Sequence, residues 1–247
     1  ILSIILLTKI SFAQTNFTQY VNPFIGTGGH GHTFPGAVVP FGMVQLSPDT
    51  RVDGSWDGCS GYHYSDTIIY GFSHTHLSGT GCSDYGDILL MPIPNVLQPK
   101  MISDQKNYSS TFNHENEKAS AGYYSVKLNN GIHVELTCTE RVGFHKYSFN
   151  GSSANIVLDL VHRDEVIDSK LYAINDSVVE GMRESKAWAQ NQIVYFYLKF
   201  SRPFTDIYLL ADSLAGKNAD RFVHGKSLKA EFTFSNKNEK PLLVKVG

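Results

Sequence analysis

The feature that most constrains this fold is an alternation of apolar and polar residues that runs through most of the chain after Asp87. Alternate residues of a β-strand point to opposite faces of a sheet, so this two-residue period predicts strands that are buried on one face. No segment keeps a 3.6-residue apolar period for three helical turns. We therefore predict an all-β protein, an antiparallel β-sandwich. The predicted strands are residues 88–92, 122–128, 133–138, 143–149, 155–161, 171–175, 178–183, 193–200, 207–211, 229–235 and 242–246.

Three segments between these strands carry more specific expectations. Residues 214–218 are predicted to form one helical turn, and residues 104–120 form a polar stretch that we expect to be mobile. Asn130-Gly131 lies between two predicted strands. This dipeptide favours a type I′ hairpin turn, in which both central residues have positive φ.

Length and charge narrow the class of protein. A chain of 247 residues with 42% hydrophobic residues can build one large β domain or two small ones. The net charge is −2, and lysines and arginines are scattered. These features give no basic stripe for nucleic acid and no polybasic patch for a membrane surface.

The first thirteen residues, ILSIILLTKISFA, form a short apolar run that ends in a small-residue Ser-x-Ala pattern. We expect residues 1–13 to be the remnant of a signal peptide, which predicts a secreted or periplasmic protein. A buried first strand is the alternative. The chain opens without methionine and closes inside an apolar alternation, so we expect both ends to be truncated and residues 14–247 to form one β-sandwich domain.

Residues 24–87 are rich in glycine, histidine and aromatic residues and contain neither lysine nor glutamate. The tract holds three dense blocks, at residues 30–50, 55–66 and 71–87. An ordinary core does not require this composition. We therefore expect the function to reside here and the rest of the chain to serve as scaffold.

The second block has the composition of a sugar-binding loop. Trp56 and Asp57 precede Cys59 and a run of serine, glycine, tyrosine and histidine. An aromatic ring can stack on the C–H groups of a sugar, while carboxylates, imidazoles and backbone N–H groups bind its hydroxyls. The alternative is an ordinary buried tryptophan.

Two pairs of alternate histidines, His30/His32 and His74/His76, could present imidazoles to a shared metal. Aspartates nearby could complete a zinc or calcium site. The alternative, which we favour, is that these histidines hydrogen-bond to loop backbone. No established zinc-ligand spacing is present.

The chain has three cysteines. A Cys59–Cys82 disulfide would join the second and third blocks and leave Cys138 free, whereas the alternative is that all three are small buried thiols. Several aspartates could act as general acids or bases, but their spacing selects no pair.

Taken together, the blocks NPFIGTGGHGHTFPGAVVPFGMVQLSPDT, WDGCSGYHYSD and GFSHTHLSGTGCSDYGD are recognisable. With the later segments GYYSVKL, IHVELTCTERVGFHKYSF, NIVLDL and GMRESKAWAQNQIVYFYLKFS, they closely resemble the N-terminal domain of glycoside hydrolase family 92. This family comprises calcium-dependent exo-acting α-mannosidases. The resemblance runs from about Tyr20 to Gly247.

The resemblance implies an N-terminal supersandwich-like β domain packed on a larger helical (α/α)6 barrel, which is missing from this sequence. Such enzymes remove terminal α-linked mannose, commonly α-1,2, from mannose-containing glycans with inversion. In the family the general acid, the general base and most calcium ligands lie in the helical domain. We therefore assign no catalytic residue and no metal ligand to this chain, and expect the fragment alone to be inactive.

By the same resemblance, Trp56 is expected to contact the terminal mannose, with Asp57 and Cys59 beside it. Weaker candidates, for shaping the domain junction, lie in the first and third blocks: His32, His74, His76, Ser78 and Gly79. Two other functions are weighed against the mannosidase: a free-standing carbohydrate-binding module that uses the same Trp56 loop, and a small metalloprotein built on the two histidine pairs.

Overall fold

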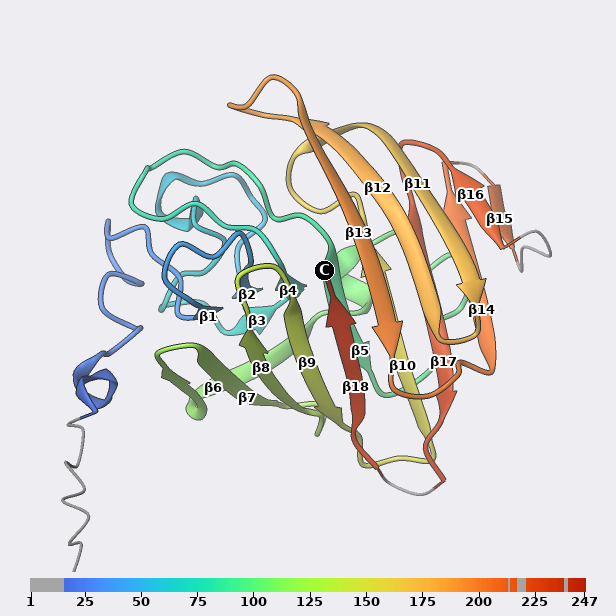
Figure 1. Cartoon of the computed structure of the whole chain (residues 1–247), viewed down its shortest axis with the longest axis horizontal. Coiled ribbons are helices and arrows are strands. Elements are labelled where there is room, and N and C mark those ends of the chain that lie inside the picture. Colours follow the sequence, from blue (N-terminus) through green and yellow to red (C-terminus); the bar gives the residue numbers. More distant parts are fainter. Residues whose placement is uncertain (1–15, 213, 217–220, 238–239) are drawn as a thin grey trace, which may run out of the picture.

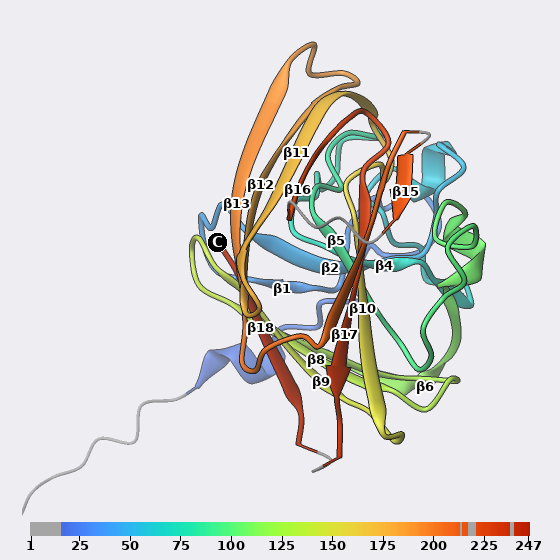
Figure 2. The same ribbon diagram turned by 90° about the vertical axis from the view of Figure 1, so that its right-hand side faces the viewer.

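The computed structural model describes residues 16–212, 214–216, 221–237 and 240–247. These residues form eighteen strands and three short 3-10 helices, and the strands make two antiparallel sheets that face each other (Figures 1 and 2). The predicted all-β sandwich is confirmed. The expected signal-peptide remnant lies outside the described residues. In the part of the chain that the structure covers, no helix is long and apolar enough to span a bilayer.

One sheet has eight strands in the order β1-β2-β4-β5-β10-β17-β14-β15. Its first three strands come from the glycine-rich and histidine-rich tract, and they continue an otherwise regular antiparallel sheet at one edge. The strand bounds are β1 Ala37–Val38, β2 Gln45–Asp49, β4 Gly71–Ser73, β5 Leu89–Ile93, β10 Ser153–Asp159, β14 Asp206–Ala211, β15 Leu214–Gly216 and β17 Lys229–Ser235.

The other sheet has ten strands in the order β16-β11-β12-β13-β18-β9-β8-β7-β6-β3. Because β3 also belongs to the tract, the tract contributes to both sheets. The bounds are β3 Ile68–Ile69, β6 Ser110–Ser120, β7 Tyr123–Leu128, β8 His133–Cys138, β9 Gly143–Ser148, β11 Glu165–Asn175, β12 Val178–Lys186, β13 Gln192–Phe200, β16 Phe222–His224 and β18 Leu242–Val246.

Phenylalanines from both sheets pack at the centre of the sandwich. The ring of Phe200 on β13 lies 4.8 Å from that of Phe234 and 5.0 Å from that of Phe232, both on β17. Phe204 packs on the same group, and all four side chains are buried. Burying a phenylalanine side chain contributes about 1.5–3 kcal/mol, so this cluster is a principal contact between the sheets.

All eleven predicted strands occur. The bounds of residues 133–138, 229–235 and 242–246 agree with β8, β17 and β18, and the others shift by a few residues at their ends. The largest differences are at β11, which begins at Glu165 instead of residue 171, and at β12, which ends at Lys186 instead of residue 183. Both added segments contain several polar residues.

The expectation of a mobile segment at residues 104–120 is wrong. The segment holds the 3-10 helix η3 (Gln105–Asn107) and the eleven-residue strand β6. A buried carboxylate explains the error: Glu117 accepts hydrogen bonds from the hydroxyls of Tyr62, at 2.8 Å, and Tyr124, at 2.7 Å. A buried glutamate breaks the apolar alternation on which the strand prediction depends.

Two turn predictions also need correction. Residues 214–216 form strand β15 and pair with β14 instead of forming a helical turn. The hairpin at Asn130-Gly131 is confirmed, but of these two residues only Gly131 has a positive φ, 92°. The N–H of Gly131 donates to the Leu128 carbonyl, and the N–H of Leu128 donates to the Ile132 carbonyl. This is a three-residue loop, a type I turn followed by a glycine bulge, and not a type I′ turn.

Candidate functional site

The tryptophan of the second block is displayed to solvent. Trp56 opens the short 3-10 helix η2 (Trp56–Gly58), in which the N–H of Cys59 donates to the Trp56 carbonyl. The side chain of Trp56 is 61% exposed. A large ring held in contact with water on an ordered helix is available to a ligand, so the alternative of a buried tryptophan is excluded.

The first block supports this ring. The imidazole of His32 stands edge-on to the indole of Trp56, with ring centroids 4.9 Å apart and planes at 82°. His32 is buried and has a φ of 54°, a left-handed conformation that is uncommon for a residue with a Cβ atom. Its Nε2 has no hydrogen-bond partner among the described residues, and Oδ1 of Asp57 lies 3.8 Å away.

Asp57 lies between two histidines of the first block. Its Oδ1 is 2.5 Å from Nδ1 of His30, and this hydrogen bond lowers the pKa of Asp57 below its ordinary value. The side chain of His30 is largely exposed, whereas that of Asp57 is half-buried. A carboxylate therefore lies beside the indole ring and is oriented by an imidazole.

The third block completes the surface. The backbone N–H of Gly79 donates to the carbonyl of His32 at 2.6 Å. Two residues later, the backbone of Gly81 lies against the Trp56 ring, so closely that a Cβ atom there would be 2.5 Å from Cη2 of the indole. Gly81 has a φ of +68°, which also favours glycine. Ser78 and Gly79 are exposed in the same loop.

A side chain from outside the tract holds the second and third blocks together. Arg163 donates from Nη2 to the carbonyl of Cys59, at 2.7 Å, and to Oγ of Ser83, at 2.6 Å. Sequence reasoning missed this residue, because nothing near Arg163 in the sequence indicates that it reaches a loop eighty residues away.

Cys59 supports the loop from inside. It is 2% exposed, and burial raises the pKa of its thiol. Cys59, Cys82 and Cys138 are all free thiols in the structure, without a Cys59–Cys82 disulfide, but only Cys59 is buried, whereas Cys82 and Cys138 are half-buried.

His74 is part of the core. Its Nδ1 is 2.6 Å from the carbonyl oxygen of Ile88, and its Nε2 is 2.9 Å from Nε2 of His145. Burial lowers the pKa of His74 to about 4, so the ring is neutral at physiological pH. It does not reach the surface formed by Trp56.

His76 is also enclosed. Its Nδ1 lies 2.7 Å from the carbonyl oxygen of Gln45, and its Nε2 lies 3.2 Å from Oδ1 of Asp49. The two histidine pairs of the sequence are therefore used differently: His30 and His32 adjoin Trp56, whereas His74 and His76 hold strands together. The described residues contain no group of three or more His, Cys, Asp or Glu side chains that could hold a metal ion, so the metalloprotein hypothesis has no support among them.

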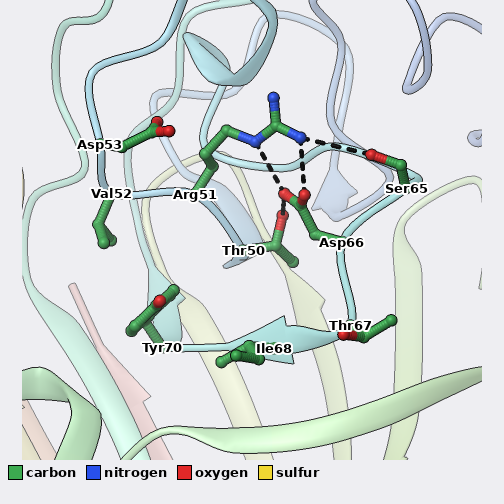
Figure 3. Close-up of a pocket in the computed structure, with 9 residues that line it drawn as sticks. All are labelled: Thr50, Arg51, Val52, Asp53, Ser65, Asp66, Thr67, Ile68 and Tyr70. Atoms are coloured by element: carbon green, nitrogen blue, oxygen red, sulfur yellow. Dashed lines mark hydrogen bonds and ion pairs between the residues drawn. The ribbon is translucent and has the colours of Figure 1, made fainter.

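A cavity of about 410 Å³ is lined by residues 50–53 and by residues between Ser65 and Tyr70, on either side of η2 in the sequence (Figure 3). Arg51 and Thr50 both bind the carboxylate of Asp66, with Arg51 Nη2 at 2.7 Å and Thr50 Oγ1 at 2.9 Å. The aliphatic stem of Arg51 packs under Gly58, where a Cβ atom would lie 2.3 Å from Cδ of Arg51. This ion pair fixes the base of the helix that presents Trp56.

The assembled surface combines a flat exposed ring, one carboxylate, imidazoles and exposed loop backbone, with little net charge. These are the groups that recognise neutral sugars. Of the residues named from the sequence, the structure brings together His32, Trp56, Asp57, Ser78 and Gly79. It places Cys59, His74 and His76 beneath the surface.

Known proteins resemble this chain in both sequence and fold. Residues 20–247 match the glycosyl hydrolase family 92 N-terminal domain. An uncharacterized secreted glycosidase from Arthroderma benhamiae is 34% identical over 154 residues, which cover 58% of this chain and 19% of that protein.

Two solved structures from Bacteroides thetaiotaomicron share the fold. A family 92 α-mannosidase in complex with mannoimidazole is 36% identical with a TM-score of 0.84, over 93% of this chain and 32% of that one. A family 92 inverting mannosidase is 27% identical with a TM-score of 0.80, over 96% of this chain and 32% of that one. The chain thus spans about a third of the length of these solved relatives. Because the family match covers nearly all of it, the chain belongs to glycoside hydrolase family 92 and corresponds to its N-terminal domain.

Proposed function

We propose that this chain forms one wall of the sugar pocket of a secreted exo-α-mannosidase, acting on terminal, α-1,2-linked mannose of glycans. The observation that carries the proposal is the exposed indole of Trp56, which His32 and Gly81 support from two other blocks of the tract. The relatives that are named as mannosidases have the same fold.

In this proposal Trp56 stacks against a pyranose ring of the substrate. Asp57 accepts hydrogen bonds from sugar hydroxyls, and His30 keeps its carboxylate oriented and ionised. The hydroxyl of Ser78, in the exposed part of the same loop, adds a further donor. Because these groups are held before the sugar arrives, little conformational entropy is lost on binding.

The chemical step requires groups that this surface does not supply. Inversion needs two carboxyl groups about 6.5–9.5 Å apart, a spacing that leaves room for a water molecule between the general base and the sugar. Asp57, the carboxylate next to Trp56 in the chain, is hydrogen-bonded to His30. We therefore propose that the general acid and the general base belong to a helical domain that packs against this one.

Calcium is proposed for the complete enzyme, with its ligands in the same helical domain. The side chains described here do not fit a calcium site, because no three potential metal ligands converge. We route no step of the reaction through calcium at this surface.

Calorimetric titration of the 247-residue chain with methyl α-mannoside tests the proposal. We expect saturable binding that Trp56→Ala weakens at least tenfold, a loss of about 1.4 kcal/mol. Tyr195→Ala is a matched control, since Tyr195 is a 74% exposed aromatic residue on β13. Equal binding by the wild type and Trp56→Ala would contradict a sugar contact at Trp56.

The second candidate is a carbohydrate-binding module without catalysis, which the same exposed indole supports. Hydrolysis of an aryl α-mannoside separates the two functions. We expect none from the 247-residue chain, and expect turnover from a protein in which the reading frame continues past Gly247 into a helix-rich segment. Turnover by the 247-residue chain alone would refute the proposal that the general acid and the general base belong to a separate helical domain.

For localisation we propose secretion or a bacterial periplasm. The apolar run at residues 1–13 and the secreted relative from Arthroderma benhamiae support export. Fractionation of the source cells with antibody to the domain tests it, and recovery from the cytosol would contradict it.

A further inference from the structure

The second tryptophan of the chain, Trp188, is also displayed to solvent. It is 66% exposed and lies in the connection between β12 and β13, at the top of Figure 1. The connection is an ordered turn: the N–H of Ala187 donates to the carbonyl of Ala189, and the Gln190 amide donates to the carbonyls of Ala187 and Trp188. The hydrogen bonds of the turn hold the backbone that carries this exposed ring in place before any ligand binds.

The turn that carries Trp188 is attached to the third block. The N–H of Ala189 donates to Oδ2 of Asp84 at 3.1 Å. Asp84 follows Gly81 by three residues, and Gly81 lies against the ring of Trp56. Three residues of chain span at most about 11 Å. The ring of Trp56 and the backbone next to Trp188 therefore contact the same short loop.

Both strands next to the turn are fixed to the same block. Arg183 on β12 forms a buried ion pair with Asp87, and Gln192 on β13 donates from Nε2 to Oδ2 of Asp87 at 2.6 Å. Together with Asp84, this gives three attachments between the hairpin and the third block. Trp188 is therefore held in a fixed position relative to the loop that supports Trp56.

The surroundings of Trp188 suit a neutral polar ligand. The uncharged amide of Gln190 donates to the Trp188 carbonyl, while Lys186, equally near in sequence, is the ion-pair partner of Glu165. A flat ring with hydrogen-bonding groups beside it is also what Trp56 presents, there together with the carboxylate of Asp57.

We propose that Trp188 is a second sugar-contact residue, which stacks on a pyranose ring farther along the glycan whose terminal residue is bound at Trp56. The inference rests on the proposed function and extends it: the domain recognises glycans of two or more sugar residues. A monosaccharide occupies the Trp56 contact and leaves Trp188 free.

Because the chain has two tryptophans, each contact has its own fluorescence signal. In Trp188→Phe only Trp56 emits, and in Trp56→Phe only Trp188 emits. Each 247-residue variant is titrated with methyl α-mannoside, α-mannobiose and α-mannotriose. The Trp56 signal is expected to change with all three sugars, and the Trp188 signal only with the disaccharide or trisaccharide.

Calorimetry with the same sugars supplies a second readout. Trp188→Ala is expected to raise the Kd of the trisaccharide about five- to tenfold and that of the monosaccharide by less than twofold. Tyr195→Ala, which removes an exposed ring from β13 outside the turn, is expected to change neither value. Circular dichroism checks that each variant is folded, and Trp188→Phe tests the ring contact with less perturbation.

The outcomes separate the two proposals. A Trp188 signal that no sugar changes, with a Trp56 signal that responds, overturns the second contact and leaves the proposed function standing. If no sugar changes the fluorescence of either tryptophan, both the second contact and the proposed function are overturned. An affinity loss in Trp188→Ala that is equal for all three sugars also overturns the inference, because it indicates a general effect on the loop.

Discussion

The indole of Trp56 rests on the backbone of Gly81, with no room for a side chain between them. Trp56 and Gly81 are twenty-five residues apart and belong to different blocks of the tract, so their contact depends on the tertiary fold. His32, from the first block, meets the same ring edge-on. One exposed side chain therefore depends on three separate segments of the chain for its position.

The first prediction concerns this contact. Gly81→Ala introduces a Cβ atom 2.5 Å from the ring and a side chain at a φ of +68°. Gly79 is a matched control, because its φ is +75° and a Cβ atom there would meet nothing within 4 Å. Both variants should lose about 1–2 kcal/mol from backbone strain, and only Gly81→Ala should also change the emission of Trp56. Measured in the Trp188→Phe background, equal spectra for the two variants would show that position 81 does not hold the ring.

A second prediction concerns ionisation at the site. The hydrogen bond from His30 lowers the pKa of Asp57 in the folded protein. The pair therefore stabilises the folded state at pH values above the pKa that this carboxyl has in the unfolded chain. This stabilisation is lost as the pH falls through the lower pKa of the folded state. His30→Ala should move the Asp57 pKa, followed by carboxyl 13C NMR, upwards towards its ordinary value. His133→Ala, at an exposed histidine near Glu135, should leave it unchanged. An unchanged Asp57 pKa in His30→Ala would mean that the hydrogen bond does not form in solution.

The third prediction uses a buried carboxyl far from the site. Burial raises the pKa of Glu231 to about 7, although its oxygens accept from the N–H of Leu97. The folded protein therefore holds an extra proton between about pH 4.5 and 7, and the free energy of unfolding decreases as pH rises through this window. Glu231→Gln should be more stable than wild type at pH 8 by about 1–2 kcal/mol, after allowance for solvent screening, and about equal at pH 4.

Urea unfolding at the two pH values measures this difference. Glu165→Gln, at an exposed glutamate on β11, serves as the control and should show little dependence on pH. A stability gain at pH 4 as large as that at pH 8 would indicate repacking instead of a titration.

The fourth prediction concerns the buried arginine that fixes the Trp188 hairpin. Arg183 pairs with Asp87 and donates to the carbonyls of Leu160 and His162, both at 2.9 Å, with no exposed surface. Arg183→Met leaves the Asp87 carboxylate buried without its cation and should cost about 3–5 kcal/mol in the free energy of unfolding.

The comparison for Arg183 is an arginine in an exposed ion pair. Arg221 pairs with Asp176 at the surface, so Arg221→Met should cost less than about 1 kcal/mol. Adding Asp87→Asn to Arg183→Met should recover part of the loss, because the uncompensated charge is removed. If urea unfolding shows that Arg183→Met and Arg221→Met lower the free energy of unfolding by similar amounts, the burial of the Arg183–Asp87 pair does not set the cost of losing the arginine.

Much of the fold can be predicted from the sequence because sheet strands have a local signature. In β8, buried residues alternate with less buried ones, and in β17 Ala230, Phe232 and Phe234 alternate with polar residues, so the limits of both strands agree with the prediction. β6 lacks this apolar period because its buried position at Glu117 is polar, with hydrogen bonds from two tyrosine hydroxyls and a contact with His114. Of these partners, Tyr62 is brought to Glu117 only by the tertiary structure.

The sequence predicts which tract of the chain forms the candidate site, but it identifies only some of the individual residues in that site. Trp56 and Asp57 stand out by composition, and the structure displays both. Spacing cannot distinguish His32 from His74, since both belong to a His-x-His pair, yet one lies beside Trp56 and the other bonds to His145 in the core. Arg163 and Trp188 lie far along the chain from the tract, so only the folded structure connects them to it.

The central claim is that Trp56, supported by His32 and Gly81, is a sugar contact. The most direct test is a crystal structure of the 247-residue chain soaked with α-mannobiose. We expect a pyranose ring stacked on the exposed face of Trp56, at the van der Waals separation of about 3.5–4 Å between carbon atoms, with a hydroxyl bound to Asp57. Well-ordered disaccharide bound elsewhere, with Trp56 left bare, would contradict it.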